Sequence, residues 1–171
     1  MLISDYYRQM NAELHGKRSY GAGGYRWAAK VADMADKIDA KSILDYGCGK
    51  ATLAAAIPKY PVVNYDPAIP DWSSRPEPAD LVVCLDVLEH IEPDCLDAVL
   101  DDLAGLTKQR GLLVIATRSA RKVLPDGRNA HLIVKSPEWW KDAIGARFDV
   151  ICSEINDDIG EVSFIVGGKH D

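Results

Sequence analysis

The chain has 171 residues, which is enough for one domain with a sizeable core but not for two. Its net charge of −6 is opposite in sign to that of proteins that coat nucleic acid, although this does not exclude a nucleic-acid substrate. No apolar stretch reaches the roughly 18 residues that span a membrane, and no signal peptide is evident. Four scattered cysteines, with no CxxC pair, are typical of buried thiols in a reducing compartment. We therefore expect a cytoplasmic protein without a membrane partner.

Helices and strands are expected to alternate along the chain. Residues 1–24 end in a glycine cluster typical of a turn, and the apolar spacing within 25–38 predicts an amphipathic helix. The later segments are predicted, in order, as strand 42–47, helix 51–60, strand 61–67, strand 80–87, helix 94–106, strand 111–117, helix 136–148, strand 148–155 and strand 161–168.

This alternation predicts an α/β protein with a doubly wound, Rossmann-like sheet. The last two strands have only a short turn between them, so they should form an antiparallel hairpin at one end of the sheet. We expect a single domain over residues 1–171, with a helical cap at 1–38 and the sheet core at 39–171.

The stretch LDYGCGKATL predicts a cofactor loop, because Asp45 ends a strand and Gly47 and Gly49 let the backbone approach a ligand closely. A dinucleotide would favour G-x-G-x-x-G, but Thr52 occupies the sixth position, and Asp45 would repel a pyrophosphate. The ammonium and sulfonium of S-adenosylmethionine suit a carboxylate at this place. Asp66, about twenty residues after the loop, lies where an acid accepts hydrogen bonds from ribose hydroxyls. A nicotinamide-dependent oxidoreductase is the disfavoured alternative.

DYGCGKATL resembles the first motif of class I methyltransferases, D-x-G-x-G-x-G, with Ala51 in place of the last glycine. CLDVLEHIEP and HLIVKSPEWWKDAIGARFDVI resemble later segments of the same family, and the nearest type is the ubiquinone-biosynthesis O-methyltransferases. The resemblance implies the strand order 3-2-1-4-5-7-6, with strand 7 antiparallel. Because few residues separate Asp66 from the strand at 80–87, the third strand must be shortened or missing. Trp72 would then either stack on the adenine or cap the sheet edge.

The resemblance also implies a cofactor site. In the family an arginine about twenty residues before the glycine loop binds the cofactor carboxylate, which points to Arg26 here, and the position of Leu85 lines the site. The expected cofactor-binding residues are Arg26, Asp45, Gly47, Cys48, Gly49, Asp66, Pro67, Leu85 and Asp86.

A second cluster follows the strand at 80–87. Asp86, Glu89 and His90 would share one face if the chain turned helically there. Three interpretations stay open: a structural helix start, general-base catalysis by His90 or His131, or a divalent metal such as Mg²⁺ held by Asp86, Glu89, His90 and His131. The last resembles ubiquinone-type and small-RNA 2′-O-methyltransferases.

The insertion at residues 117–135 is basic in an acidic protein. Arg118, Arg121 and Lys122 are candidates for binding a phosphate or carboxylate of the substrate, and a solvated loop is the alternative. No [DNS]-P-P-[YFW] motif of amino-methylating DNA enzymes is present. We therefore expect a methyltransferase acting at oxygen on a small or anionic acceptor. The alternatives are a non-catalytic S-adenosylmethionine-binding subunit and a metal-assisted 2′-O-methyltransferase of nucleotides or RNA.

Overall fold

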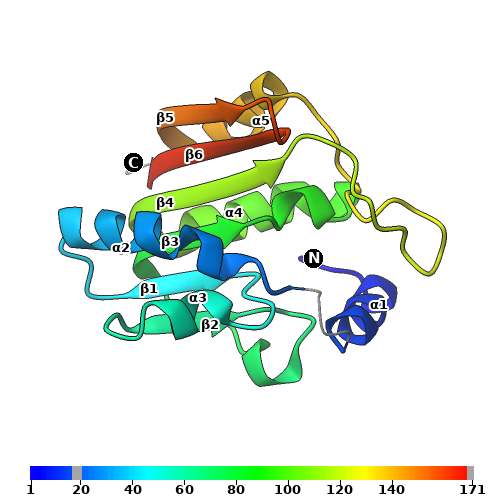
Figure 1. The fold of residues 1–171 in the computed structure, drawn as a ribbon, viewed down its shortest axis with the longest axis horizontal. Coiled ribbons are helices and arrows are strands. Elements are labelled where there is room, and N and C mark those ends of the chain that lie inside the picture. The colour runs from blue at the N-terminus through cyan, green and yellow to red at the C-terminus, as the bar shows by residue number, and fades with distance from the viewer. Residues whose placement is uncertain (17–20, 169–171) are drawn as a thin grey trace.

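The computed structural model describes residues 1–16 and 21–168, which form one six-stranded sheet with helices on both faces (Figure 1). The strands are β1 Ile43–Tyr46, β2 Val62–Tyr65, β3 Ala79–Leu85, β4 Thr107–Ala116, β5 Phe148–Asn156 and β6 Glu161–Gly168. The α-helices are α1 Asp5–His15, α2 Ala28–Lys37, α3 Thr52–Ala56, α4 Leu96–Leu106 and α5 Pro137–Gly145. Short 3₁₀ turns lie at Gly24–Trp27, Pro70–Trp72, Leu88–His90 and Pro93–Cys95.

The strand order is β2-β1-β3-β4-β6-β5, with β6 antiparallel to both of its neighbours. This confirms the predicted Rossmann-like topology without its third strand. Within residues 66–78, all of which are described, the chain makes only the 3₁₀ turn at Pro70–Trp72 between β2 and β3. The sheet therefore ends at β2 on that side.

Two apolar cores lie on opposite faces of the sheet. Successive residues of β3 alternate between them, since Val82 packs with α4 and α5, whereas Leu81 and Val83 pack with α2 and α3. Burial on both faces explains why this strand is a continuous apolar run in the sequence.

Several boundaries differ from the expected ones. The helix predicted over 25–38 begins at Ala28, because Gly24–Trp27 forms a 3₁₀ turn, and β4 begins at Thr107, directly after α4. The cysteines were expected to be buried, but Cys152 is exposed on β5.

The carboxyl ends of β1, β2, β3 and β4 meet at one edge of the sheet, since these strands are parallel. Helix α1 lies at this end of the molecule (Figure 1). It forms a third, smaller core with the insertion, in which Tyr7, Met10 and Leu14 pack on Leu124 and Ala130.

Candidate functional site

The glycine loop after β1 is tightly enclosed. Gly47 has φ 78°, and a Cβ there would lie 2.5 Å from a methyl group of Val87. Gly49 has φ 53°, and its Cβ would lie 2.5 Å from the carbonyl oxygen of Gly21. Ala51, which replaces the family's last glycine, has a similar left-handed φ of 53°. The loop thus needs glycine at both 47 and 49, for conformation and for space.

Two acidic side chains lie beside this loop. Asp45, in β1, is only 3% exposed. Burial of its carboxyl, and secondarily the nearby Asp66, raises the pKa of Asp45 from 3.8 to about 7. Asp66 accepts hydrogen bonds from the backbone N–H of Gly49 at 3.2 Å and of Ala68 at 2.9 Å. The main chain therefore fixes the Asp66 carboxylate next to the glycine loop.

A cavity of about 310 Å³ opens over these residues, a volume within the usual range for small-molecule sites. Most of the predicted cofactor residues line it, together with His90: Asp45, Gly47, Cys48, Gly49, Asp66, Pro67, Leu85 and Asp86. Trp72 is not among the described residues that line the cavity, and its carbonyl accepts from the Asp66 N–H at 2.9 Å. Buried carboxylates beside a crowded glycine loop fit the positively charged end of S-adenosylmethionine.

Arg26 does not line the cavity. Its guanidinium pairs with Asp86 at 2.6 Å, and the Arg26 side chain is 49% exposed. Asp86 itself has a left-handed φ of 56°, which is strained for a residue other than glycine. Arg26 thus stands next to the cofactor cavity through Asp86, and its contact with a cofactor carboxylate stays a prediction.

Glu89, His90 and His131 form a second group, which we call the histidine cluster. One ligand atom of each lies within 4.8 Å of the others. Glu89 is completely buried, accepts a hydrogen bond from the Ala116 N–H at 3.0 Å, and keeps its Oε2 without a partner among the described residues. Burial, and secondarily Asp86, raises the Glu89 pKa to about 8.

Both histidines are oriented through Nδ1. His90 Nδ1 lies 2.7 Å from the carbonyl oxygen of Ala130, and His131 Nδ1 lies 2.6 Å from that of Arg118. A carbonyl only accepts, so each Nδ1 carries the proton, and in a neutral ring Nε2 is then the basic nitrogen. The rings contact edge to face, with centroids 4.8 Å apart.

Asp86 lies outside the histidine cluster, in contrast to the expectation of one shared helical face. The chain turns at Asp86 with positive φ, and the 3₁₀ turn begins only at Leu88, so the spacing of Asp86, Glu89 and His90 does not place them on one helix. Asp86 faces Arg26 instead.

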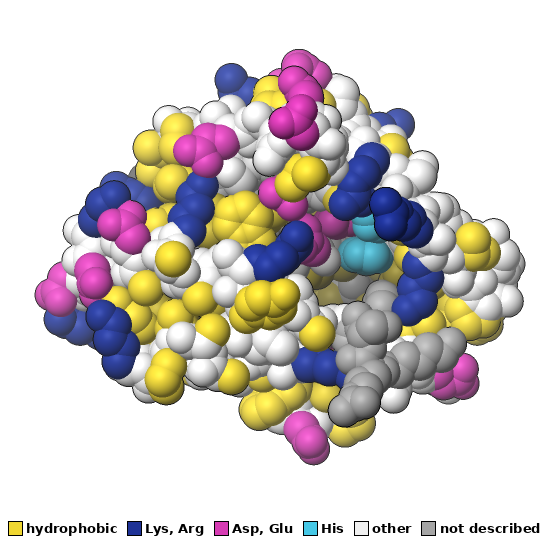
Figure 2. Space-filling view, viewed as in Figure 1, with side chains coloured by type: hydrophobic (Ala, Val, Ile, Leu, Met, Phe, Trp, Pro, Cys, Tyr) yellow, Lys and Arg dark blue, Asp and Glu magenta, His cyan; other side chains and the backbone are white. Residues whose placement is uncertain are grey.

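The three residues of the insertion that were expected to bind the substrate do not line the cavity. Arg118 donates from Nε to the Ile159 carbonyl at 2.7 Å, Arg121 is exposed, and Lys122 is partly buried. Arg118 is nevertheless adjacent to the histidine cluster, because its carbonyl orients His131. Figure 2 shows histidine side chains at the surface with Lys and Arg side chains close by.

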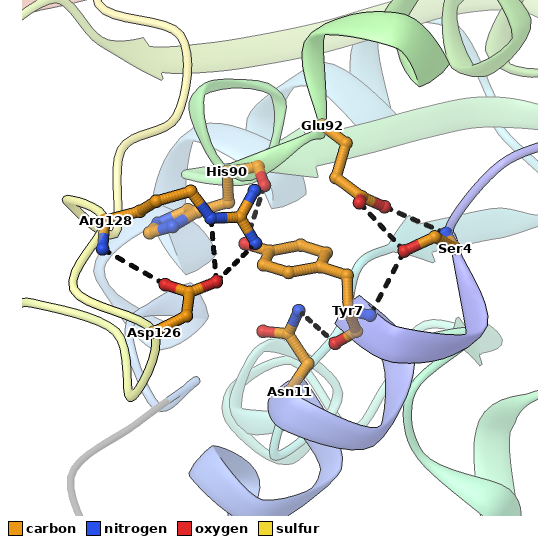
Figure 3. Close-up of polar contacts among 7 residues, drawn as sticks. All are labelled: Ser4, Tyr7, Asn11, His90, Glu92, Asp126 and Arg128. Carbon is orange, nitrogen blue, oxygen red and sulfur yellow. Dashed lines mark hydrogen bonds and ion pairs between the residues drawn. The ribbon is translucent and has the colours of Figure 1, made fainter.

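The sequence patterns did not predict that N-terminal residues line the cavity. Leu2 and Ile3, which precede α1, and Tyr7 and Asn11 of α1 all do so. Ser4 caps α1, because its hydroxyl accepts a hydrogen bond from the Tyr7 N–H. A serine followed directly by an acid is a known sign of a helix start and could have predicted this one. Figure 3 shows Tyr7 next to His90 and Arg128; the Tyr7 hydroxyl donates to the His90 carbonyl, and the Arg128 guanidinium lies over the Tyr7 ring. Glu161 at the start of β6 was also missed; burial, and secondarily Asp86, raises its pKa.

Comparisons with known proteins agree with this geometry. Residues 17–155 match the family described as a methyltransferase domain. No curated protein sequence matches the chain. One similar solved structure is 1,6-didemethyltoxoflavin-N1-methyltransferase of Burkholderia thailandensis with bound S-adenosylhomocysteine. The two chains have a TM-score of 0.68 and are 16% identical, and the match covers 99% of this chain and 92% of the other.

Two further structures are similar in fold. Magnesium protoporphyrin IX methyltransferase of Synechocystis PCC 6803, with bound S-adenosylhomocysteine, has a TM-score of 0.62 at 14% identity over 96% of this chain and 94% of its own. Mitomycin 7-O-methyltransferase has a TM-score of 0.67 at 12% identity over 97% of this chain and 61% of its own. Among the described residues, every helix is too short or too polar to cross a membrane. The chain belongs to the methyltransferase domain family, and its fold is that of S-adenosylmethionine-dependent methyltransferases.

Proposed function

We propose that the protein transfers the methyl group of S-adenosylmethionine to an oxygen atom of a small anionic acceptor. One observation carries the cofactor placement: two buried carboxylates, Asp45 and Asp66, line the same cavity as the glycine loop. Asp45 would face the amino group of the cofactor, and Asp66 would accept from the ribose hydroxyls. The cofactor supplies an activated methyl group, and the protein has to align the acceptor with it and exclude water.

The histidine cluster supports an acceptor hydroxyl as the nucleophile. His131 presents its basic Nε2, because Nδ1 is held by the Arg118 carbonyl, and an imidazole takes a proton near neutral pH. Arg118 and Arg121 would neutralise a carboxylate or phosphate of the acceptor on the adjacent surface. The roles of His90, His131 and the insertion are part of this proposal.

A divalent metal in the histidine cluster is a second candidate, favoured by two observations. Metal-binding imidazoles usually donate their other N–H to a carbonyl or carboxylate, as both rings do here, and Glu89 Oε2 has no partner among the described residues. Two nitrogens and one carboxylate oxygen suit Mn²⁺, Fe²⁺ or Zn²⁺ better than Mg²⁺. The metal would orient and help to deprotonate the acceptor hydroxyl.

Two measurements test the proposal. Calorimetry with S-adenosylhomocysteine and, separately, with NAD examines the cofactor; binding of NAD alone would overturn the cofactor assignment. Release of S-adenosylhomocysteine from S-adenosylmethionine is then measured with hydroxy acids, phenol carboxylates and nucleotides, with and without EDTA. Loss of turnover with EDTA and rescue by Mn²⁺ would select the metal-assisted form. Cofactor binding without turnover of any acceptor would favour the non-catalytic subunit.

A further inference from the structure

The cavity is lined by two kinds of side chain. Three are the carboxylates of Asp45, Asp66 and Asp86. Six are apolar and are here called the apolar end: Leu2, Ile91 and Val99, which pack in one cluster, and Ile3, Pro67 and Ala68. Two of these six, Leu2 and Ile3, come from the N-terminal segment, far in sequence from the strand-end loops.

We propose that the N-terminal segment builds the adenine subsite of the cofactor, in place of the strand that is missing between β2 and β3. The proposal rests on the proposed function only in taking S-adenosylmethionine as the ligand. It assigns Leu2 and Ile3 to the face of the base and Asn11 to its edge.

The order of groups in the cofactor supports this placement. The cofactor carries positive charge at its amino-acid end and a planar, uncharged base at the other, which matches a cavity lined by both carboxylates and apolar side chains. The ribose lies between them and is bonded directly to the base. Because Pro67 and Ala68 follow Asp66 immediately and line the cavity, a ribose held by Asp66 places the base at the apolar end.

The N-terminal segment is fixed where this role requires it. Ser4 donates from both N and Oγ to the Glu92 carboxylate, each at 2.8 Å, and the Tyr7 hydroxyl donates to the His90 carbonyl at 2.8 Å (Figure 3). The segment is thus bonded to the loop that follows β3, and this holds Leu2 and Ile3 in the cavity wall.

Asn11 is the polar side chain that α1 adds to the cavity together with Tyr7. It is 7% exposed, and its Nδ2 donates to the Tyr7 carbonyl at 3.2 Å, which orients the amide. An asparagine side chain presents a donor and an acceptor side by side, the pattern that matches N6 and N7 of adenine. This gives the apolar end a means of distinguishing adenine from other bases.

The first test measures the affinity of S-adenosylhomocysteine and of methylthioadenosine, which keeps the base and ribose but lacks the amino acid. Ile3→Asp and Leu2→Asp should weaken both ligands by about tenfold or more, in the same proportion, since stacking on a base is lost. Tyr6→Asp is the matched control, because Tyr6 lies three residues after Ile3, at the start of α1, and is 62% exposed; it should leave both affinities within about twofold.

The second test reads the base edge and does not depend on tolerating a buried aspartate. Wild-type protein should bind S-adenosylhomocysteine more tightly than S-inosylhomocysteine, in which an oxygen replaces the 6-amino group. Asn11→Ala should reduce that preference about tenfold, whereas a merely structural role would weaken both ligands equally.

Unchanged affinities in the Leu2 and Ile3 variants, with a raised KM for the acceptor, would show that the apolar end holds the acceptor instead. A wild-type protein that binds no S-adenosylhomocysteine would overturn the proposed function itself.

Discussion

The glycine-loop side of the cavity and the histidine cluster differ in what holds their functional groups. Beside the glycine loop, Asp66 is oriented by N–H groups of Gly49 and Ala68, each three residues after a strand ends. In the histidine cluster, the orienting carbonyls belong to Ala130 and Arg118, in the insertion between β4 and α5. The first arrangement follows from the order of strands in the sheet, and the second depends on how one long loop packs. The difference predicts that changes beside the loop abolish cofactor binding, whereas changes near the cluster affect the acceptor.

The largest effect is expected from Gly49→Val. Its side chain would collide with the Gly21 carbonyl at a position with left-handed φ, so the loop must move out of the cavity. S-adenosylhomocysteine binding should become undetectable by calorimetry, while the circular dichroism spectrum stays that of a folded protein. Gly105→Val is the control, because a Cβ there meets nothing within 4 Å. Retained affinity in Gly49→Val would remove the glycine loop from the site.

The next largest effect concerns Asp66. Asp66→Asn and Asp66→Ala should each lower the affinity for S-adenosylhomocysteine by at least about tenfold, or about 1.4 kcal/mol. The alanine variant should bind less tightly than the asparagine variant, because it loses both acceptor oxygens. Methylthioadenosine, which keeps the ribose, should weaken in parallel. Asp71→Asn, at an exposed acid in the following turn, serves as the control. Wild-type affinity of Asp66→Ala for both ligands would contradict the placement of the ribose.

A pH dependence follows from Asp45. Folded protein keeps the Asp45 proton up to pH about 7, whereas the ordinary pKa is 3.8, so the folded state binds more protons between these values. Asp45 therefore lowers the free energy of unfolding as the pH rises through this window, by about 1.4 kcal/mol for each pKa unit at most.

Urea unfolding from pH 4 to 8 measures this effect. Asp45→Asn should lose less stability over the range than wild type does. Saturating S-adenosylhomocysteine should remove the difference in slope, because its ammonium favours the ionised carboxylate. Equal slopes for wild type and Asp45→Asn without ligand would mean that Asp45 titrates normally.

On the acceptor side, Arg121→Glu should leave S-adenosylhomocysteine affinity unchanged, since Arg121 is exposed and lies outside the cavity lining. It should raise KM for an anionic acceptor severalfold and leave that for an uncharged acceptor unaltered. Lys108→Glu, at an exposed position in the first half of β4, is the charge-matched control. Weakened cofactor binding without an acceptor effect would contradict the assignment of the insertion.

The smallest expected effect is a gain. Ala51→Gly should raise the free energy of unfolding by about 1 kcal/mol, because alanine is strained at the left-handed φ of 53°. Chemical denaturation measures it, and Ala55→Gly in the neighbouring helix should instead destabilise. A destabilised Ala51→Gly would indicate that the methyl group packs usefully at this position.

The sequence was sufficient to predict the sheet order and the residues beside the glycine loop. Asp45, Gly49 and Asp66 could be placed because parallel strands bring their carboxyl ends to one edge, so residues immediately after each strand must meet there. Asp86 lines the cavity as expected, but it does not share a face with Glu89 and His90, since its positive φ is set by the local turn and not by helical spacing. The sequence patterns did not identify Leu2, Ile3 and Asn11 as cavity residues. Their place in the cavity depends on contacts of the N-terminal residues with Glu92 and with the insertion, which are far away in the sequence.

The position of β6 determines the order in which the sheet can be completed. β5 precedes β6 in the chain, and among the described strands it pairs with β6 alone, which lies between it and β4. During synthesis β5 therefore leaves the ribosome before this partner strand exists, and the strand edge that pairs with β6 is open until then. Chains interrupted before Glu161 should accordingly aggregate, and completion of the sheet should be the last, slowest step of folding.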